Sequence, residues 1–141
     1  MRTIIQVKEL QVGDKVAIVG SSYNPQTGYV VTKVNKLRAV LTRTSDNYER
    51  FFSVKRDCEV PASGVKGYVA RYSSIISEAE ADRMARITKQ GQDFRLACEN
   101  LSTAAANRNF AEIQRCMKHL EYVNATGAEL QVTIAAEREA A

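Results

Sequence analysis

Two glycine-punctuated runs decide the fold of the chain: Val12-Gly13-Asp14-Lys15-Val16-Ala17-Ile18-Val19-Gly20 and Gly28-Tyr29-Val30-Val31-Thr32-Lys33-Val34. In the first run a Gly-Asp turn enters a stretch of β-forming residues, and a second glycine ends it. Apolar side chains fall on both faces of this stretch, because successive residues of a strand point to opposite sides. The two runs predict two strands, joined by a loop over residues 20–28 that is rich in turn-forming residues.

Three further segments have the composition of strands, over residues 39–44, 49–54 and 68–72, and residues 4–10 predict a short leading strand or arm. Turn-forming residues separate these segments from one another. Five short strands joined by tight turns favour a small barrel over a sandwich. The alternative is a β structure whose strands do not close into a barrel.

This pattern resembles the SH3-like barrels of the KOW, Tudor and Agenet kind. The residues that carry the resemblance are Val12-Gly13-Asp14-Lys15-Val16, Gly28, Val30-Val31 with Val34, Val40-Leu41, and Arg50-Phe51-Phe52. They all lie in the first half of the chain. The resemblance implies a five-stranded SH3-like β-barrel over residues 1–72.

The second half of the chain predicts two long helices. Ser77 with Glu80, and Asn109 with Glu112, have the spacing of a capping box at a helix start. Apolar or small residues then recur every three or four positions, which is the pattern of a coiled-coil seam. The seam positions are Met84, Ile87, Gly91, Phe94, Cys98, Leu101 and Ala105, then Ile113, Cys116, Leu120, Val123, Gly127, Leu130 and Ile134. The helices are expected over about 78–106 and 110–138.

A short connection over residues 107–109 predicts that the two helices pack antiparallel as a hairpin. Folding the chain there brings Gly91 and Gly127 to nearly the same height, which predicts a close crossing. The alternative is that these glycines only weaken or kink each helix. A seam diluted by Gly, Ala and Cys would make one hairpin marginal alone. We therefore expect a homodimer through the helical hairpin, with four helices.

The expected fold class is α+β, with an SH3-like five-stranded β-barrel followed by a long antiparallel α-helical hairpin. The expected domains are a basic barrel over residues 1–72, a linker over 73–77 and the hairpin over 78–141. Charge divides in the same way. Residues 1–76 hold 12 Lys and Arg against 6 Asp and Glu, whereas the remainder holds 8 against 10. A basic first half is a hint about acidic partners.

The cysteines and the apolar runs indicate the compartment. Cys58, Cys98 and Cys116 show no CxxC spacing, which suits a reducing compartment and disfavours a disulfide between the last two. No signal-peptide core follows Met1, and no apolar run approaches the roughly 20 residues that a membrane span requires. The sequence predicts a cytoplasmic protein without membrane contact.

No catalytic constellation is visible in the sequence. His119 is the single histidine, and it predicts a surface side chain at the rim of the second seam. One histidine and unspaced cysteines do not fit the usual zinc patterns. Glu78, Glu80 and Asp82 lie at a helix start, where acidic residues favour the dipole without any catalytic role. We expect no enzyme activity, no metal and no cofactor.

The strongest functional signal combines cations with an aromatic residue on the predicted strands and turns: Lys33, Lys36, Arg38, Arg43, Tyr48, Arg50, Lys55 and Arg56. Cations can reach phosphates and exposed aromatic rings can stack on bases. The alternatives are an acidic protein partner, or cations that only keep an exposed edge soluble while the aromatic rings fill the barrel.

The resulting hypothesis is a non-enzymatic adaptor whose basic barrel contacts nucleic acid or a transcription or translation complex, while the hairpin dimerises or docks a protein partner. The order of parts is similar to that of CarD-type RNA-polymerase-binding factors, in which a Tudor-like barrel precedes helices; this chain lacks their full helical tail. The first alternative is a structural or inhibitory regulator of the phage type that assembles through its helices and blocks a protein partner. The second is a protein that holds a small anionic ligand between assembled subunits.

Overall fold

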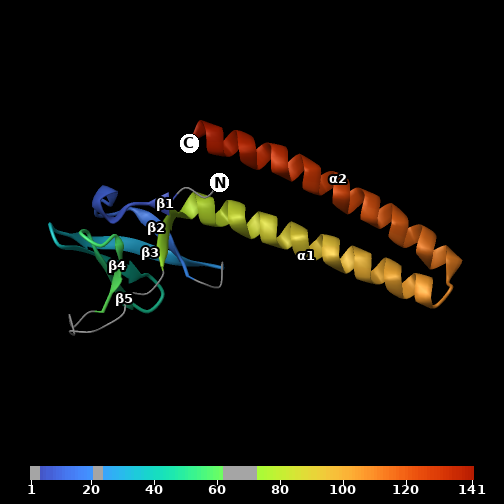
Figure 1. Cartoon of the computed structure of the whole chain (residues 1–141), viewed down its shortest axis with the longest axis horizontal. Coiled ribbons are helices and arrows are strands. Elements are labelled where there is room, and N and C mark those ends of the chain that lie inside the picture. The colour runs from blue at the N-terminus through green and yellow to red at the C-terminus, as the bar shows by residue number, and fades with distance from the viewer. Residues whose placement is uncertain (1–3, 21–23, 62–72) are drawn as a thin grey trace. The chain divides into compact units, whose positions relative to one another are not determined.

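The first part of the chain forms one seven-stranded antiparallel sheet that curls into a half-barrel (Figure 1). The structure, a computed structural model, describes residues 4–20, 24–61 and 73–141. The strands are β1 (Ile4–Ile5), β2 (Lys15–Val19), β3 (Pro25–Val34), β4 (Arg38–Arg43), β5 (Glu49–Ser53), β6 (Cys58–Val60) and β7 (Ser74–Ser77). A short 3-10 helix, η1 (Val7–Glu9), follows β1. The strand order across the sheet is β1-β7-β2-β3-β4-β5-β6.

The predicted linker over residues 73–77 is wrong, because β7 lies there. This strand pairs with β1 on one side and with β2 on the other. Ile75 and Ile76 point to opposite faces and are both buried, so β7 is an interior strand whose flanking serines resemble a loop. With β6, which was also not predicted, the sheet has seven strands instead of five. The predicted closing strand over residues 68–72 lies outside the described residues.

The predicted loop over residues 20–28 is also too long. β3 begins at Pro25, which pairs with Val19, and the ladder continues with Gln26 opposite Ile18. A proline is tolerated as the first residue of a strand, where its missing N–H costs the ladder least. Because residues 25–28 are of turn-forming types, the sequence did not reveal that β3 already pairs with β2 there.

The alternation in the opening run places its side chains as expected. Val16 and Ile18 belong to the main apolar core, while Ala17 and Val19 are buried on the other face of β2. The remaining members of the core are Val7, Leu10, Tyr29, Val31, Ala39, Leu41, Phe52 and Ile75. Gly13 has a φ of +96° and donates its N–H to Val31 O at 2.8 Å. This left-handed turn, which favours glycine, starts β2 at the position that the sequence predicts.

Two long helices follow the sheet, α1 (Glu78–Ala106) and α2 (Phe110–Ala140). Both predicted caps are present. Ser77 Oγ accepts a hydrogen bond from Glu80 N at 3.1 Å, and Asn109 Oδ1 accepts one from Glu112 N at 3.2 Å. These bonds satisfy backbone donors that the first turn of a helix leaves without a partner. Arg108, with a φ of 53°, lies in the turn between the helices.

The face of α1 that meets α2 is displaced by one residue from the predicted seam. Arg83 Nε donates to Glu137 at 3.1 Å, and Gln90 Nε2 donates to Val123 O at 2.6 Å. Ala97 and Ala104 are buried. The four α1 residues lie seven positions apart, each one residue before a predicted seam position. On α2, Cys116, Val123 and Ile134 are buried, and all three were predicted seam residues.

The predicted close crossing of two glycines is wrong. Gly91 is exposed, and a Cβ built there would meet nothing within 4 Å. A Cβ at Gly127 would instead lie 2.8 Å from Gln90 Nε2. The displaced face of α1 therefore brings Gln90 against Gly127 and turns Gly91 away from α2.

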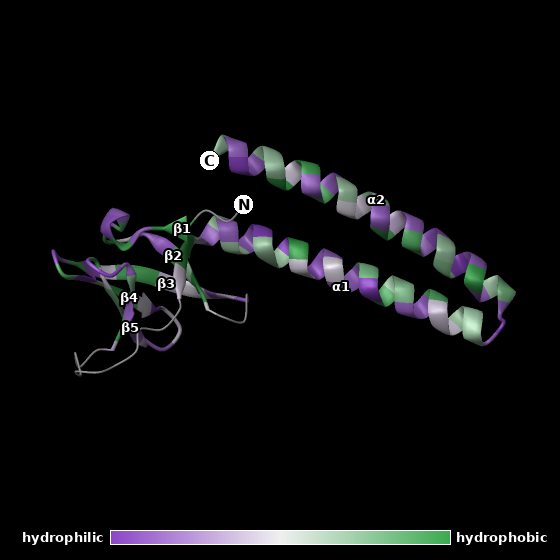
Figure 2. Ribbon diagram, viewed as in Figure 1, coloured by the Kyte–Doolittle hydropathy of each residue, from purple (hydrophilic) through white to green (hydrophobic). Residues whose placement is uncertain are grey.

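The chain divides into two compact units, Met1–Asp82 and Arg83–Ala141. Hydrophobic and hydrophilic residues alternate along both helices (Figure 2). Neither helix that the structure describes is sufficiently long and apolar to cross a membrane.

Candidate nucleic-acid interface

Two turns meet at one end of the sheet. The turn between β3 and β4 lies beside the turn between β5 and β6, because Val54 N donates to Leu37 O at 2.9 Å. Asp57 Oδ1 accepts a hydrogen bond from Val7 N at 2.7 Å, which attaches η1 to the same place. We call this region the basic end and define it by its cations: Lys8, Lys33, Lys36, Arg38, Lys55 and Arg56.

Local hydrogen bonds fix the shape of both turns. Asn35 Oδ1 accepts from Leu37 N at 2.8 Å and from Arg38 N at 2.9 Å. In the second turn Ser53 Oγ accepts from Arg56 N at 3.2 Å, and Asp57 adopts a φ of 49°. Side chains that bond to nearby backbone in this way are typical of tight turns. The backbone carrying the cations is therefore defined although their side chains extend into solvent.

All six cations of the basic end are exposed. Within the described part of the chain none of them forms an ion pair. The two carboxylates nearby are already engaged with backbone, since Glu9 accepts from Gln6 N and Asp57 from Val7 N. The guanidinium of Arg38 lies 5.1 Å from the centre of the Phe51 ring. The backbone bonds leave the charges of Glu9 and Asp57 in place, but six cations against two carboxylates give the basic end a net positive charge.

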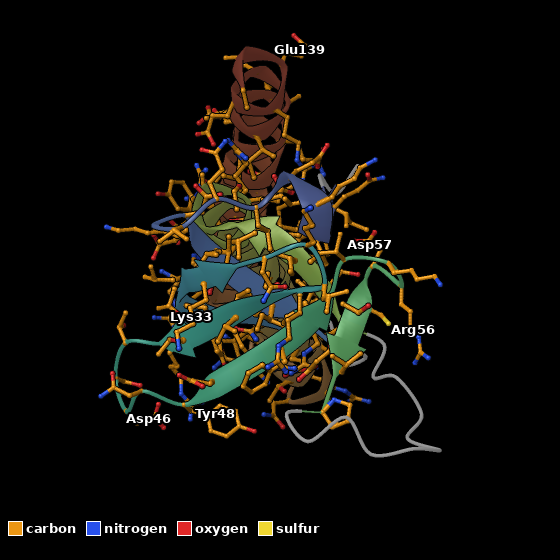
Figure 3. All side chains as sticks on the ribbon, turned by 90° about the vertical axis from the view of Figure 1, so that its left-hand side faces the viewer. Lys33, Asp46, Tyr48, Arg56, Asp57 and Glu139 are labelled. Atoms are coloured by element: carbon orange, nitrogen blue, oxygen red, sulfur yellow. The ribbon has the colours of Figure 1, made fainter. Side chains whose placement is uncertain are left out.

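Two residues of the predicted binding set lie elsewhere, at the turn between β4 and β5. Arg43 forms an ion pair with Asp46 at 2.5 Å and lies 5.2 Å from the centre of the Tyr48 ring. The hydrogen bond from Arg43 holds the pKa of Asp46 down to about 2. Figure 3 labels Lys33, Asp46 and Tyr48 on one side of the view and Arg56 and Asp57 on the other, with the Arg56 side chain extending outward. Arg38 is the first residue of β4 and the turn of Asp46 follows its last residue, so the two lie at opposite ends of that strand. Arg43 and Tyr48 therefore do not belong to the basic end.

Arg50 is an interior residue. It donates to both oxygens of Glu59, at 2.8 and 2.5 Å, and to Gln26 at 2.9 Å. Ser73 Oγ donates to the same carboxylate at 2.9 Å. Burial is the largest single influence and lowers the pKa of Arg50, but the hydrogen bonds and charge interactions with Glu59 and Tyr29 together outweigh it, so the pKa is raised. Arg50 stabilises the half-barrel, and it cannot contact an external phosphate.

The predicted set of eight residues is thus divided. Five members come together at the basic end: Lys33, Lys36, Arg38, Lys55 and Arg56. Lys8 was missed, because only the bond between Val7 and Asp57 brings η1 to these turns. Glu59 was missed as the partner of Arg50. Its place opposite Phe52 in the ladder, and hence on the inner face, depends on recognising β6 as a strand.

The second unit carries a shallow apolar groove along the two helices, with a volume of about 390 Å³. Ile87 and Phe94 are 44% and 42% exposed there, although both are seam positions. The remaining lining residues from α1 and α2 are Gln90, Gly91, Val123, Asn124, Gly127, Ala128, Leu130 and Gln131. A second depression shares Phe94 and continues past Leu101, Met117 and Leu120. We call the two together the helix groove.

Within the described ranges His119 has no catalytic partner of a familiar kind. It lies exposed beside Tyr122, with ring centres 6.5 Å apart. The thiol of Cys116 points to the Glu112 carboxylate, which also pairs with Arg115. The hydrogen bond from Arg115 lowers the pKa of Glu112. Among the residues that the structure describes, no three His, Cys, Asp or Glu side chains gather so as to hold a metal ion.

The chain was compared with protein-family models, with curated proteins and with solved structures, and no match was found. The case for a function therefore rests on the basic end and on the helix groove.

Proposed function

We propose that the protein is a non-enzymatic adaptor. Its basic end contacts the phosphates of a nucleic acid, and its helices join it to a protein partner or to another copy. The observation that carries the first part is a set of six exposed cations on two adjoining turns and on the elements beside them, where both nearby carboxylates already accept hydrogen bonds from backbone.

The chemistry of the basic end suits a phosphate backbone better than a base edge. Lysine ammonium groups act as point charges that need no fixed hydrogen-bond geometry, and four of the six cations are lysine. Neutralising phosphates releases condensed counterions, which makes binding tight at low salt and sequence-independent. Arg38 and Phe51 together offer a flat surface on which an unpaired base could stack.

Charge reversal at the basic end tests this proposal. The variant Lys36→Glu with Arg56→Glu changes one cation in each turn, and both side chains are exposed. Lys89→Glu with Lys118→Glu is the matched control, since it makes the same change in net charge on exposed helical positions. Fluorescence anisotropy with labelled DNA and RNA, single- and double-stranded, measures affinity at several salt concentrations.

We expect the unmutated protein to bind with a log–log salt slope that the turn variant lowers by about 2, since each phosphate contact contributes about 0.9. The helical control should keep that slope. Absence of binding by the unmutated protein at about 50 mM salt would overturn the nucleic-acid part. Equal losses in both variants would show that net charge alone, and not the basic end, is responsible.

The helix groove favours a second candidate function, a structural or inhibitory regulator that acts through its helices. Exposed apolar side chains gathered along one groove are typical of a protein contact. This candidate predicts that charge reversal at the basic end leaves the regulatory effect of the protein in its host cell unchanged, whereas substitutions in the helix groove abolish that effect.

A further inference from the structure

We propose that the helix groove of one copy is covered by α1 of a second copy, related by a two-fold axis, with Phe94 of each copy seated against Gly91 of the other. This inference rests on the helical half of the proposed function and names its partner. The two-fold axis would cross α1 between Gln92 and Asp93.

The core between α1 and α2 is small, so the pair of helices needs a further surface to bury more apolar area. In the second unit the buried residues that the structure describes are Ala97, Ala104, Cys116, Val123 and Ile134. Two of these are alanines and one is a cysteine, so little apolar area is removed from water. Helices draw most of their stability from the packing of an apolar face, and a pair that buries so little is marginal alone.

α1 carries two adjacent stripes, and only one of them meets α2. The stripe that meets α2 contains Arg83, Gln90, Ala97 and Ala104, whereas the next stripe contains Met84, Gly91, Cys98 and Ala105. Ile87, Phe94 and Leu101 lie between the two. A helix that packs in a bundle has apolar positions toward neighbours on two sides, whereas an isolated pair needs one seam. The second stripe of α1 is therefore the face that a further helix would cover.

The second stripe is complementary to itself, which identifies that further helix as another α1. In an antiparallel two-fold crossing between Gln92 and Asp93, Gly91 faces Phe94 of the other copy. The same symmetry sets Ile87 opposite Cys98. Each pair joins a large side chain to a small one, as close packing requires.

The space at Gly91 is open and the Phe94 ring is available to fill it. Apart from the backbone and the immediate neighbours of Gly91 in α1, no heavy atom of the described residues lies within 4 Å of a Cβ built on Gly91, while Phe94 is 42% exposed three residues further along the helix. An isologous interface uses the same patch twice, so each copy supplies both the knob and the hole. An unrelated helix would need both a small residue to accept Phe94 and a large side chain to fill the space at Gly91.

The flanks of this stripe do not oppose the crossing. Thr88 and Gln90 lie on one side of the midpoint, and Arg95 and Ala97 on the other. Only one of these four residues is charged, so the two-fold arrangement brings no like charges together at its flanks.

Exchange of the knob and the hole tests the inference. Sedimentation equilibrium measures the mass of the full chain over a range of concentrations, and circular dichroism checks that the helices form. We expect a mass twice that of the 15.7 kDa chain. Phe94→Ala and Gly91→Phe should each weaken dimerisation by about tenfold or more. The double variant Gly91→Phe with Phe94→Ala should recover most of that loss, because it re-creates the pair with the roles reversed.

Leu96→Ala is the matched control, because Leu96 is 56% exposed on the outer face of α1 and lies in neither stripe. A monomer at every concentration up to about 100 µM would overturn the inference, and so would a dimer that none of these variants weakens. Failure of the double variant to recover dimerisation would overturn the two-fold pairing of Phe94 with Gly91. Mass and nucleic-acid affinity of the unmutated protein, measured together, separate the proposals: an unmutated protein that is monomeric and binds nucleic acid overturns this inference alone, whereas a dimer that does not bind overturns only the nucleic-acid part.

Discussion

Arg50 and Glu59 form an ion pair inside the half-barrel, with side chains that are 10% and 7% exposed. The pair connects β5 to β6, and the further bonds to Gln26 and Ser73 reach β3 and the residue before β7. Taking two charges out of water is costly, and the cost is met only where geometry and additional hydrogen bonds are good. Both conditions hold here. Through Gln26 and Ser73 the network links β5 and β6 to segments that the backbone ladder does not pair with them.

Removing one partner of this pair should destabilise the sheet strongly. In Arg50→Met the buried Glu59 carboxylate loses both hydrogen bonds and the charge of Arg50, and we expect the unfolding free energy to fall by about 3 kcal/mol. Urea unfolding followed by circular dichroism measures the loss. Arg43→Met is the matched control, because Arg43 pairs with Asp46 on the surface, where water screens the interaction. A loss in Arg50→Met no larger than that in the control would contradict a stabilising role.

The long elements of this fold could be predicted from the sequence because their signals are local. Capping residues and a seam over many turns mark α1 and α2, and glycines with alternating apolar residues mark β2. β7 could not be found in the same way, since Ser74–Ser77 is short and its identity as a strand depends on two partners that are distant in the chain. Burial on both faces replaces the alternation that would have revealed it.

The candidate site was predictable only in part for the same reason. Lys36 and Lys55 are recognisable as cations in turns, but a hydrogen bond between Leu37 and Val54 brings the turns together. Composition also could not distinguish Arg50 from the exposed cations, because its buried role depends on the face of the sheet to which its side chain points. A one-residue displacement on α1 likewise decided which glycine meets the other helix.

An ion-pair group joins the start of α1 to the end of α2. Glu137 of α2 accepts from Arg86 at 2.5 Å and from Arg83 at 3.1 Å. The hydrogen bond from Arg86, followed by that from Arg83, lowers the pKa of Glu137 below its ordinary 4.5. A carboxylate with a lowered pKa stabilises the fold above its unfolded pKa, and this stability is lost as the pH falls through the folded value.

Glu137→Gln should therefore lower the thermal midpoint of the helices at pH 7, and the difference from the unmutated protein should shrink as the pH falls below about 4.5. Circular dichroism melts at several pH values measure it. Glu139→Gln is the matched control, because Glu139 is exposed two residues away and forms no ion pair in the described part of the chain. If the difference in thermal midpoint between Glu137→Gln and the unmutated protein is constant from pH 7 to pH 3, the charge of Glu137 does not contribute to stability.

The two units divide the chain chemically as well as structurally. The sheet unit carries the basic end, and the helical unit carries the apolar groove. A surface that binds by charge weakens with salt, whereas an apolar contact does not. Salt should therefore release nucleic acid without separating the copies. Each proposed dimer would then present two basic ends while its helices stay associated.

Two basic ends on one dimer should make binding depend on the length of the nucleic acid. Once one end is bound, the second contact is intramolecular, so a duplex that accommodates both gains affinity beyond the statistical effect of more sites. We expect a duplex of about 60 base pairs to bind at least about tenfold tighter than one of about 15, and Phe94→Ala to reduce that ratio while leaving affinity for the short duplex unchanged. Leu96→Ala should keep the ratio of the unmutated protein. If Phe94→Ala separates the copies and the length dependence persists, the gain arises within a single copy and the two units act independently.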